Sequence, residues 1–512
     1  MTLSKDSLEW SLNFLKKHSD GDIFPKLPEI DAIIEKKNDF IQLIEGKPLT
    51  EFIPNPCRRF IVPKDEISYR QATQLHPQDS ILLSALVYQF GQGIENRRLS
   101  AKRVFSYRFL PSHDEGLYSS KTAWNDFWTT AHKKTQESSF ILICDIADFY
   151  NQIYHHTVEN QLADSGFPNQ AIKWIRMLLE STTAGVSRGV PIGPHAIHLI
   201  AEASLIPIDN SIQSRGLDFI RFIDDMVIFC NSEKDATKAL SILALTLDRQ
   251  QRLMLQKHKT KIYTPHEFRS FCQEMLEDRP IDDNEERLLE IIKKYTGDNP
   301  YISITYNDIK PEDWEQFSDE IVTIIIKEYL AKKETDYIRL RWFYRRLAQV
   351  GHPGALKVSI DNISKLGPCF ASICAYIASI QSIEPEQWKI LGGNLLQLLE
   401  SEEVLNNEFF RISILSLFTK NEHINHFPCL AKVFQNSDPF SRREIILASI
   451  KNGAIDWLRE QKETYLHMDP WQQMSFIYCA SGFPKDEKKF FINRFDYGEP
   501  FKKILAKWSK ST

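Results

Sequence analysis

The most restrictive feature of this sequence is an Asp-Asp pair between two apolar runs, in the segment DFIRFIDDMVIFC over residues 218–230. Each run has the length and the β-branched and aromatic content of a strand, so the segment predicts a β-hairpin with Asp224 and Asp225 at its turn. Adjacent carboxylates beside buried strands are costly unless a cation neutralises them. A plain acidic turn gives the same local pattern, because Asp is common in turns. Taken alone, the pair leaves these two interpretations evenly matched.

A second acidic position favours the metal interpretation. The five apolar residues 140–144 predict a buried strand, and Asp145 follows directly, where such a strand opens to solvent. Three carboxylates on adjacent strands, from Asp145, Asp224 and Asp225, would supply hard oxygen ligands to two Mg²⁺ ions, with Mn²⁺ as an alternative. Two-metal phosphoryl transfer requires two such ions about 3.5–4 Å apart.

Charge and composition narrow the class of protein. The chain of 512 residues carries a net charge of −5, yet residues 55–134 hold 12 Lys and Arg against 7 Asp and Glu. This local excess suits a phosphate-binding groove, although a solvated basic face has the same composition. The chain has no apolar run of about 18 residues and no apolar segment of a secretory signal at its start, so we expect a cytoplasmic protein without membrane contact. The 8 cysteines form no C-x-x-C pair, which argues against a disulfide framework or a zinc site.

The periodicity divides the chain into two domains. Residues 1–50 read as a helical start, and residues 52–264 mix short strands with helices in an α+β pattern. After Phe268 the strand signals nearly vanish, and helical segments separated by Pro, Gly or Asn recur at about 30 to 45 residues per pair. We therefore predict an α+β domain over 1–275 and an all-α, HEAT-like helical-repeat domain over 276–512. An irregular helical bundle would show the same periodicity.

Five segments, in order, resemble the motifs of reverse transcriptases. They are Arg59 to Lys64 with Arg70 (fingers), Asp145 to Ile153 (motif A), Gly189 to Pro194 (motif B), Phe222 to Asp225 (motif C) and Leu253 to Ile262 (motif D). The form Gly-Val-Pro-Ile-Gly-Pro followed by Ala201-Glu202, with a long helical C-terminal half, is similar to bacterial abortive-infection (Abi) reverse transcriptases, in particular a prophage-encoded member.

The resemblance implies a fold, an activity and partners. The fold is reverse-transcriptase-like fingers and palm followed by the helical repeats, and the activity is metal-dependent DNA synthesis. In the Abi family this synthesis is untemplated and protein-primed, and it serves anti-phage defence by abortive infection. The implied partners are dNTP substrates and a single-stranded DNA product, covalently attached to the protein, in a closed homo-oligomer for which we expect a trimer. No motif identifies the priming residue, the nucleotide preference or the phage or host trigger.

The motifs also imply roles for individual residues. Asp145 and Asp224 are the expected principal metal ligands, with Asp225 less direct and the Ile146 carbonyl completing a site. Tyr150 matches the family's sugar gate, where an aromatic ring leaves no room for a 2′-hydroxyl.

The remaining candidates would contact the phosphates or allow the backbone to approach the nucleotide closely. Lys64 and Arg70 suit the β- and γ-phosphates, because both are cationic at neutral pH. Lys259 matches the motif D lysine, a candidate acid for the pyrophosphate leaving group; a solvated member of the KHKTK run is an equal alternative. Gly189 and Gly193 would allow close approach to a nucleotide, although a turn before a helix requires glycine as well.

Two further features have structural explanations of similar weight. Arg221 beside the hairpin could balance the carboxylates or contact phosphate, or it could be an ordinary surface arginine. The adjacent His155 and His156 cannot easily share one ligand sphere, so we expect both on a helix surface.

The departures from the family pattern bear on templating. Templated members carry Gln where Ile192 stands and Ser where Ile197 stands, and neither a primer grip nor a thumb is recognisable after Thr264. This favours untemplated addition over a templated polymerase of the retron or group II intron kind. Another alternative is a binding protein whose helical repeats sense a phage component, with a secondary polymerase site.

Overall fold

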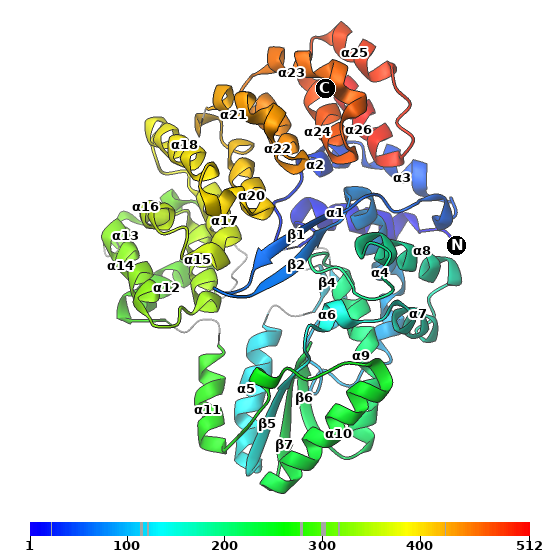
Figure 1. Cartoon of the computed structure of the whole chain (residues 1–512), viewed down its shortest axis with the longest axis vertical. Coiled ribbons are helices and arrows are strands. Elements are labelled where there is room, and N and C mark those ends of the chain that lie inside the picture. Colours follow the sequence, from blue (N-terminus) through cyan, green and yellow to red (C-terminus); the bar gives the residue numbers. More distant parts are fainter. Residues whose placement is uncertain are drawn as a thin grey trace.

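The computed structural model describes residues 1–21, 23–112, 116–119, 122–276, 280–297, 304–315, 318–424 and 426–512. Its N-terminal part contains three helices, a two-stranded ribbon and a long helix: α1 (Lys5–Lys17), α2 (Pro28–Glu35), α3 (Lys37–Ile44), β1 (Arg58–Pro63), β2 (Tyr69–Gln74) and α4 (Pro77–Glu95). β1 and β2 are antiparallel, with Val62 opposite Arg70. Their ribbon projects between the two halves of the molecule (Figure 1).

A four-stranded antiparallel sheet in the order β6-β7-β5-β8 carries the acidic segments. Its strands are β5 (Phe140–Asp145), β6 (Asp218–Phe222), β7 (Asp225–Cys230) and β8 (Lys261–Tyr263), and a small ribbon pairs β3 (Phe109–Ser112) with β4 (Gly116–Tyr118). The predicted strand before Asp145 and the predicted hairpin are confirmed.

Alternation along these strands buries both faces of the sheet. Ile141, Ile143 and Val227 pack in one cluster with Phe127 of α5 and Phe268 of α11, whereas their neighbours Leu142, Cys144, Met226 and Ile228 join the main core. On that second side, α10 packs against β5 and β7. The helices of this region are α5 (Ala123–Lys134), α6 (Phe149–Gln152), α7 (His155–Asp164), α8 (Asn169–Thr182), α9 (Ile197–Ser214), α10 (Glu233–Gln251) and α11 (Pro265–Glu274). Because both faces are covered, polar side chains of the sheet can reach solvent or a ligand only at the ends of the strands.

The described residues after α11 contain helices and no strand. They are α12 (Asp283–Thr296), α13 (Pro311–Trp314), α14 (Asp319–Ala331), α15 (Tyr337–Val350), α16 (Leu356–Asp361), α17 (Phe370–Ser379), α18 (Pro385–Leu399), α19 (Glu402–Leu405), α20 (Glu408–Phe418), α21 (Phe427–Val433), α22 (Pro439–Lys451), α23 (Ile455–Gln461), α24 (Pro470–Cys479), α25 (Lys485–Asn493) and α26 (Pro500–Ser511). The predicted helical character is confirmed, whereas the HEAT-like type and the boundary at 275/276 stay predictions. Part of the segment expected to link the halves lies outside the described residues.

The helical half curves back onto the N-terminal helices. α26 packs against α2 and α3, and α20 packs against β1 (Figure 1). Two buried ion pairs cross this contact, Arg443 with Glu29 at 2.7 Å and Arg58 with Glu444 at 3.4 Å. Breaking a buried pair leaves an unpaired charge, at a cost of about 3–5 kcal/mol, so these pairs hold the two halves in one arrangement.

Candidate active site

The three predicted aspartates meet at one end of the four-stranded sheet. Asp145 is the last residue of β5 and is only 5% exposed, and its Cα lies opposite Asp225, the first residue of β7. Asp224 lies in the two-residue loop between the paired Phe222 and Asp225. The Ile146 N–H donates to the Asp224 carbonyl at 3.1 Å, which ties the loop to the end of β5.

Burial and mutual repulsion disfavour charge on these carboxylates. The pKa of Asp224 is raised to about 6, mainly by burial and to a smaller extent by the charge of Asp145. The pKa of Asp225 is raised to about 7, mainly by burial and to a smaller extent by the charge of Asp224. The Lys259 ammonium contacts the Asp145 carboxylate. Although burial lowers the pKa of Lys259, the hydrogen bond and charge of Asp145 outweigh it and raise the pKa, so Lys259 holds its proton at neutral pH.

The donor chemistry of the site fits a hard divalent cation. Carboxylate and carbonyl oxygens are the ligands that Mg²⁺ prefers. Burial and neighbouring carboxylates raise the pKa of Asp224 and Asp225, and a bound cation would offset this by stabilising their charged forms. Among the residues that the structure describes, no three His, Cys, Asp or Glu side chains already converge as a closed metal-binding group. The carboxylate of Asp145 is instead paired with the ammonium of Lys259.

The β1–β2 ribbon carries both candidate phosphate-binding cations. Lys64 follows β1, and Arg70 lies on β2; both side chains are exposed. The charge of Lys64 lowers the pKa of both Asp224 and Asp225 against the effect of burial. Lys64 therefore lies within electrostatic reach of the aspartates although it is far from them in sequence.

Tyr150, the predicted sugar gate, is held by a histidine that the sequence did not single out. Its hydroxyl lies 2.7 Å from Nδ1 of His198 on α9, and the His198 ring stacks on Tyr107 with ring centroids 4.1 Å apart. Burial raises the pKa of Tyr150 well above its ordinary value, and the charge of Asp224 contributes to that rise. The phenol is thus neutral, close to the acidic loop and fixed in orientation.

The two predicted glycines have backbone conformations that side chains rarely adopt. The φ angles of Gly189 and Gly193 are +102° and +134°, and a Cβ on Gly193 would lie 2.6 Å from the Thr73 carbonyl oxygen. Here β2 meets the loop before α9, where the Thr73 N–H donates to the Ile192 carbonyl at 2.7 Å. Gly193 is therefore required by close packing of the backbone.

The prediction for His155 was wrong, and the prediction for His156 is confirmed. His155 is only 3% exposed, and its Nε2 lies 2.8 Å from the Gly189 carbonyl oxygen, whereas His156 is exposed. His155 is buried because α7 begins beside the loop that contains Gly189, a proximity that the local sequence does not encode.

A cavity of about 790 Å³, the central cavity, lies beside the acidic site. Arg70, Tyr107, Ile192 and Phe222 line it from the strand-containing half, and α15 contributes cationic and aromatic side chains, Arg341, Trp342 and Arg345. Sequence analysis did not assign these α15 residues to the site, although the run RLRWFYRR was visible. Ile192 also lines the cavity.

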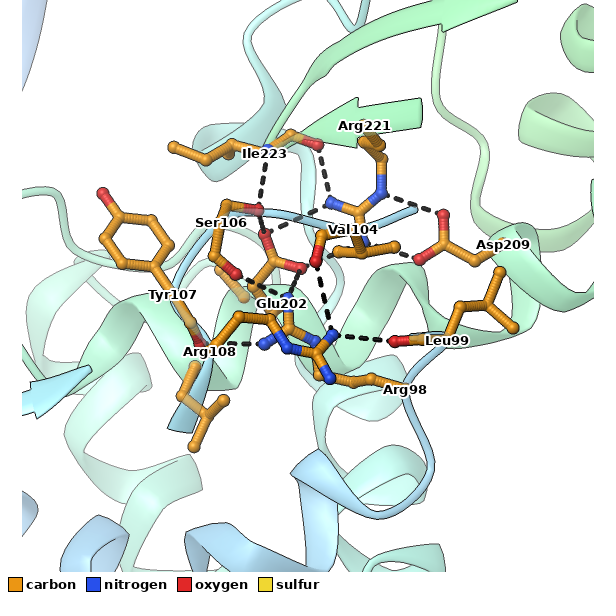
Figure 2. Close-up of polar contacts among 12 residues, drawn as sticks. Arg98, Leu99, Val104, Ser106, Tyr107, Arg108, Glu202, Asp209, Arg221 and Ile223 are labelled. Carbon is orange, nitrogen blue, oxygen red and sulfur yellow. Dashed lines mark hydrogen bonds and ion pairs between the residues drawn. The ribbon is translucent and has the colours of Figure 1, made fainter. Parts of the chain in front are cut away.

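Ile197 is 0% exposed and packs in the core at the start of α9. The interpretation of Arg221 as a surface residue, or as a partner of the aspartates of the turn or of phosphate, was wrong. Arg221 is likewise 0% exposed, and it bonds to Glu202 and Asp209 of α9 instead of lying on the surface or pairing with the aspartates of the turn (Figure 2). Its β-strand position, with the side chain turned toward α9, is what removes it from solvent.

Comparison with known proteins identifies the strand-containing part. Residues 62–289 match the family model of reverse transcriptase (RNA-dependent DNA polymerase), so the chain contains a reverse transcriptase domain, which implies nucleotidyltransferase activity. No curated protein matches the chain. Among solved structures, telomerase from Candida albicans in complex with a TWJ fragment of telomeric RNA is similar over 74% of this chain and 70% of that chain, with 9% identity and a TM-score of 0.31. Within the described residues, no helix is both long and apolar enough to span a bilayer.

Proposed function

We propose that this protein is a DNA polymerase of the reverse transcriptase type that adds deoxynucleotides without a template. The observation that carries the proposal is the meeting of Asp145 with Asp225 across β5 and β7, with Asp224 in the adjoining loop, inside a reverse transcriptase domain. Two Mg²⁺ ions bound there by these carboxylates and the Ile146 carbonyl would activate the attacking hydroxyl and stabilise the triphosphate.

The side chains around the acidic site suit a deoxynucleoside triphosphate. Lys64 and Arg70 approach on the β1–β2 ribbon, where two cations can neutralise the phosphates. The ring of Tyr150, fixed by His198, would lie under the sugar and exclude a 2′-hydroxyl. Lys259, protonated beside Asp145, would donate a proton to the departing pyrophosphate.

The size and closure of the central cavity support untemplated addition. Its volume of about 790 Å³ lies within the range of about 300–1,000 Å³ that is usual for small-molecule sites, so it would accommodate a short single strand beside the acidic site better than a double helix. α15 also closes onto the tip of the β1–β2 ribbon: Arg341 donates to the Lys64 carbonyl at 3.2 Å, and the Tyr337 hydroxyl donates to Glu66 at 3.0 Å.

The α15 side of the cavity offers a path for a single-stranded product. The Arg345 guanidinium lies over the Trp342 ring, 5.5 Å from its centroid, and both residues line the cavity. Aromatic stacking and cationic contact with phosphates hold single strands without regard to sequence. A product primed by a hydroxyl of the protein would leave along this side while remaining covalently attached.

The biological role and the assembly follow from the resemblance of the motifs to Abi reverse transcriptases. The proposed role is anti-phage defence by abortive infection, and the proposed assembly is a closed homotrimer. Size-exclusion chromatography with light scattering tests the assembly, and a stable monomer would contradict it.

The decisive experiment incubates purified protein with labelled dNTP and Mg²⁺ but without primer or template. We expect a product on a denaturing gel that migrates with the protein until protease releases it, and mass spectrometry of the adduct should locate the priming residue. The control is the Asp224→Ala, Asp225→Ala double variant.

Two other outcomes would identify the competing functions. Synthesis that requires an annealed RNA template and primer would establish a templated polymerase. No incorporation under either condition, together with specific capture of a phage component, would favour a sensing protein with a secondary polymerase site.

A further inference from the structure

The loop that carries Asp224 contains a strained residue. Ile223, the first residue of the two-residue loop, has a φ of +54°. Hairpin loops with positive φ at this position normally have glycine there, because a side chain clashes with the backbone. For a β-branched residue the cost is on the order of 1–3 kcal/mol. The surrounding structure must therefore supply interactions that keep Ile223 in this conformation.

Both backbone polar groups of Ile223 are bound by side chains from elsewhere in the chain. The Ile223 N–H donates to the Ser106 hydroxyl oxygen at 2.9 Å, and Nη1 of Arg221 donates to the Ile223 carbonyl at 2.8 Å. Figure 2 shows the two side chains on either side of this backbone unit. Neither bond involves the Ile223 side chain, so both act directly on the strained backbone.

Arg221 and Ser106 are themselves held by acidic residues of α9. Arg221 makes two bonds to Asp209, at 2.9 and 2.6 Å, and two to Glu202, at 3.2 and 2.9 Å. With the bond to Ile223, this uses the five N–H donors of a guanidinium. The Ser106 hydroxyl donates to Glu202 at 2.6 Å, which leaves its oxygen to accept from Ile223.

A second arginine completes the support from the opposite side. Arg98 donates to Glu202 at 2.8 Å and to the Ser106 carbonyl at 2.6 Å. Burial alone would raise the pKa of Glu202, but the charges of Arg221 and Arg98 lower it, so Glu202 is an anion between two cations. Arg221, Glu202 and Asp209 are all at most 2% exposed. Water therefore does not compete for these bonds, and the geometry is rigid.

We infer that Ser106, Glu202 and Arg221 are positioning residues that hold the strained Ile223 so that Asp224 and Asp225 keep their relation to Asp145. This inference rests on the proposed function, because it assigns the network to the carboxylate loop of that same site. A buried ion network that served only to join α9 to the sheet would have no need to bind the backbone of the loop.

The first test compares two buried serines. Ser106→Ala removes the acceptor for the Ile223 N–H, whereas Ser204→Ala removes a buried hydroxyl of α9 that, among the described residues, bonds to the Ala201 carbonyl alone. Hydrogen exchange at residues 222–226 should accelerate about ten-fold in Ser106→Ala and stay unchanged in Ser204→Ala, as expected for loss of one hydrogen bond. Unchanged exchange in Ser106→Ala, with both variants folded by circular dichroism, would overturn the inference.

The second test asks whether relief of strain removes the need for support. Ser106→Ala should lower kcat for dNTP incorporation about ten-fold, with the KM for dNTP unchanged, because no nucleotide contact is lost. Glycine adopts positive φ without strain, so in an Ile223→Gly background the same substitution should cost less than about three-fold. An equal loss of kcat in both backgrounds would show that Ser106 does not act through Ile223.

Failure of the proposed function can be distinguished from failure of this inference. If the wild-type protein incorporates no nucleotide, the proposed polymerase activity fails, yet hydrogen exchange still reports whether Ser106 holds the loop. If the wild type is active and the loop exchanges alike in all variants, only the positioning role fails.

Discussion

The ammonium group of Lys259 contacts the carboxylate of Asp145, two residues that are 114 positions apart in the sequence. The contact joins the 3₁₀ turn before β8, at Lys257–Lys259, to the end of β5. The backbone strengthens this link, because the Gln256 N–H donates to the Asp145 carbonyl at 2.7 Å. The Lys259 ammonium is therefore held against Asp145 although its side chain is 49% exposed.

Lys259→Ala should lower kcat for nucleotide incorporation by about 10²-fold, which is typical for loss of a general acid, with little change in dNTP affinity. Single-turnover incorporation and equilibrium nucleotide binding measure the two quantities. The matched control is Lys257→Ala, an exposed lysine on the same turn, which should leave both unchanged. Equal effects of the two substitutions would contradict an individual role for Lys259.

Replacing Asp224 and Asp225 together by Ala should abolish incorporation while the protein stays folded. Burial raises the pKa of both carboxyls, to about 6 and about 7, so their charges destabilise the folded state near neutral pH and their removal does not lower its stability. Thermal unfolding and a denaturing gel of labelled products test the two parts. Wild-type incorporation by the double variant would refute the two-metal site.

Tyr150→Ala or Tyr150→Val should allow ribonucleotides to compete with deoxynucleotides, because the proposed gate is steric. Tyr150→Phe is the matched control, since it keeps the ring and loses only the contact with His198. Competition between labelled dNTP and unlabelled rNTP measures discrimination. If small side chains at position 150 leave discrimination intact, Tyr150 is not the gate.

Arg345→Ala should weaken binding of single-stranded DNA and lower its salt dependence. Loss of one phosphate contact reduces the slope of log affinity against log salt by about 0.7 for a single strand. Fluorescence anisotropy with labelled oligothymidylate between low and moderate salt measures this slope. Arg249→Ala, an exposed arginine on α10, serves as control; equal slopes for both variants would exclude the α15 path.

Asp20→Asn should make the protein more stable than the wild type, by a margin that grows as the pH rises. The Asp20 carboxylate accepts from the Ser80 hydroxyl, and burial raises the pKa of Asp20 from 3.8 to about 7. The folded state therefore keeps a proton that the unfolded state releases, and the stability that this proton provides is full below about pH 4 and is lost as the pH rises toward 7. The Asn variant has no such loss.

Urea unfolding at pH 5 and pH 7.5 tests this prediction. The variant should gain on the wild type by about 1–3 kcal/mol between the two conditions. Asp248→Asn, at an exposed position of α10, should show no comparable gain. A constant difference between Asp20→Asn and the wild type at both pH values would show that Asp20 titrates normally.

Much of the acidic site was predictable because its signals are local. A run of five apolar residues before Asp145, and two apolar runs around Asp224 and Asp225, predict a strand and a hairpin wherever the rest of the chain lies. The helical character of the second half was predictable for the same reason, since periodicity acts within a single element.

Contacts between distant segments were not predictable in this way. Whether His155 faces solvent depends on the loop at Gly189, and whether Arg221 is exposed depends on Glu202 and Asp209. The residues next to His155 and Arg221 in the sequence do not indicate whether either side chain is buried or exposed. Their burial is settled only when α7 and α9 pack beside the sheet.

The sequence by itself determined which residues can carry the chemistry: three carboxylates at strand ends, a lysine and two cations that are charged at neutral pH, and an aromatic ring beside the first carboxylate. The tertiary structure alone decided how they are held. Ile223 keeps a strained backbone through Ser106 and Arg221, Lys259 contacts Asp145, and α15 brings Arg341 and Trp342 to the central cavity. The physical reason is that residue type sets charge and hydrogen-bonding capacity, whereas burial and partners arise only when segments far apart in the chain pack together.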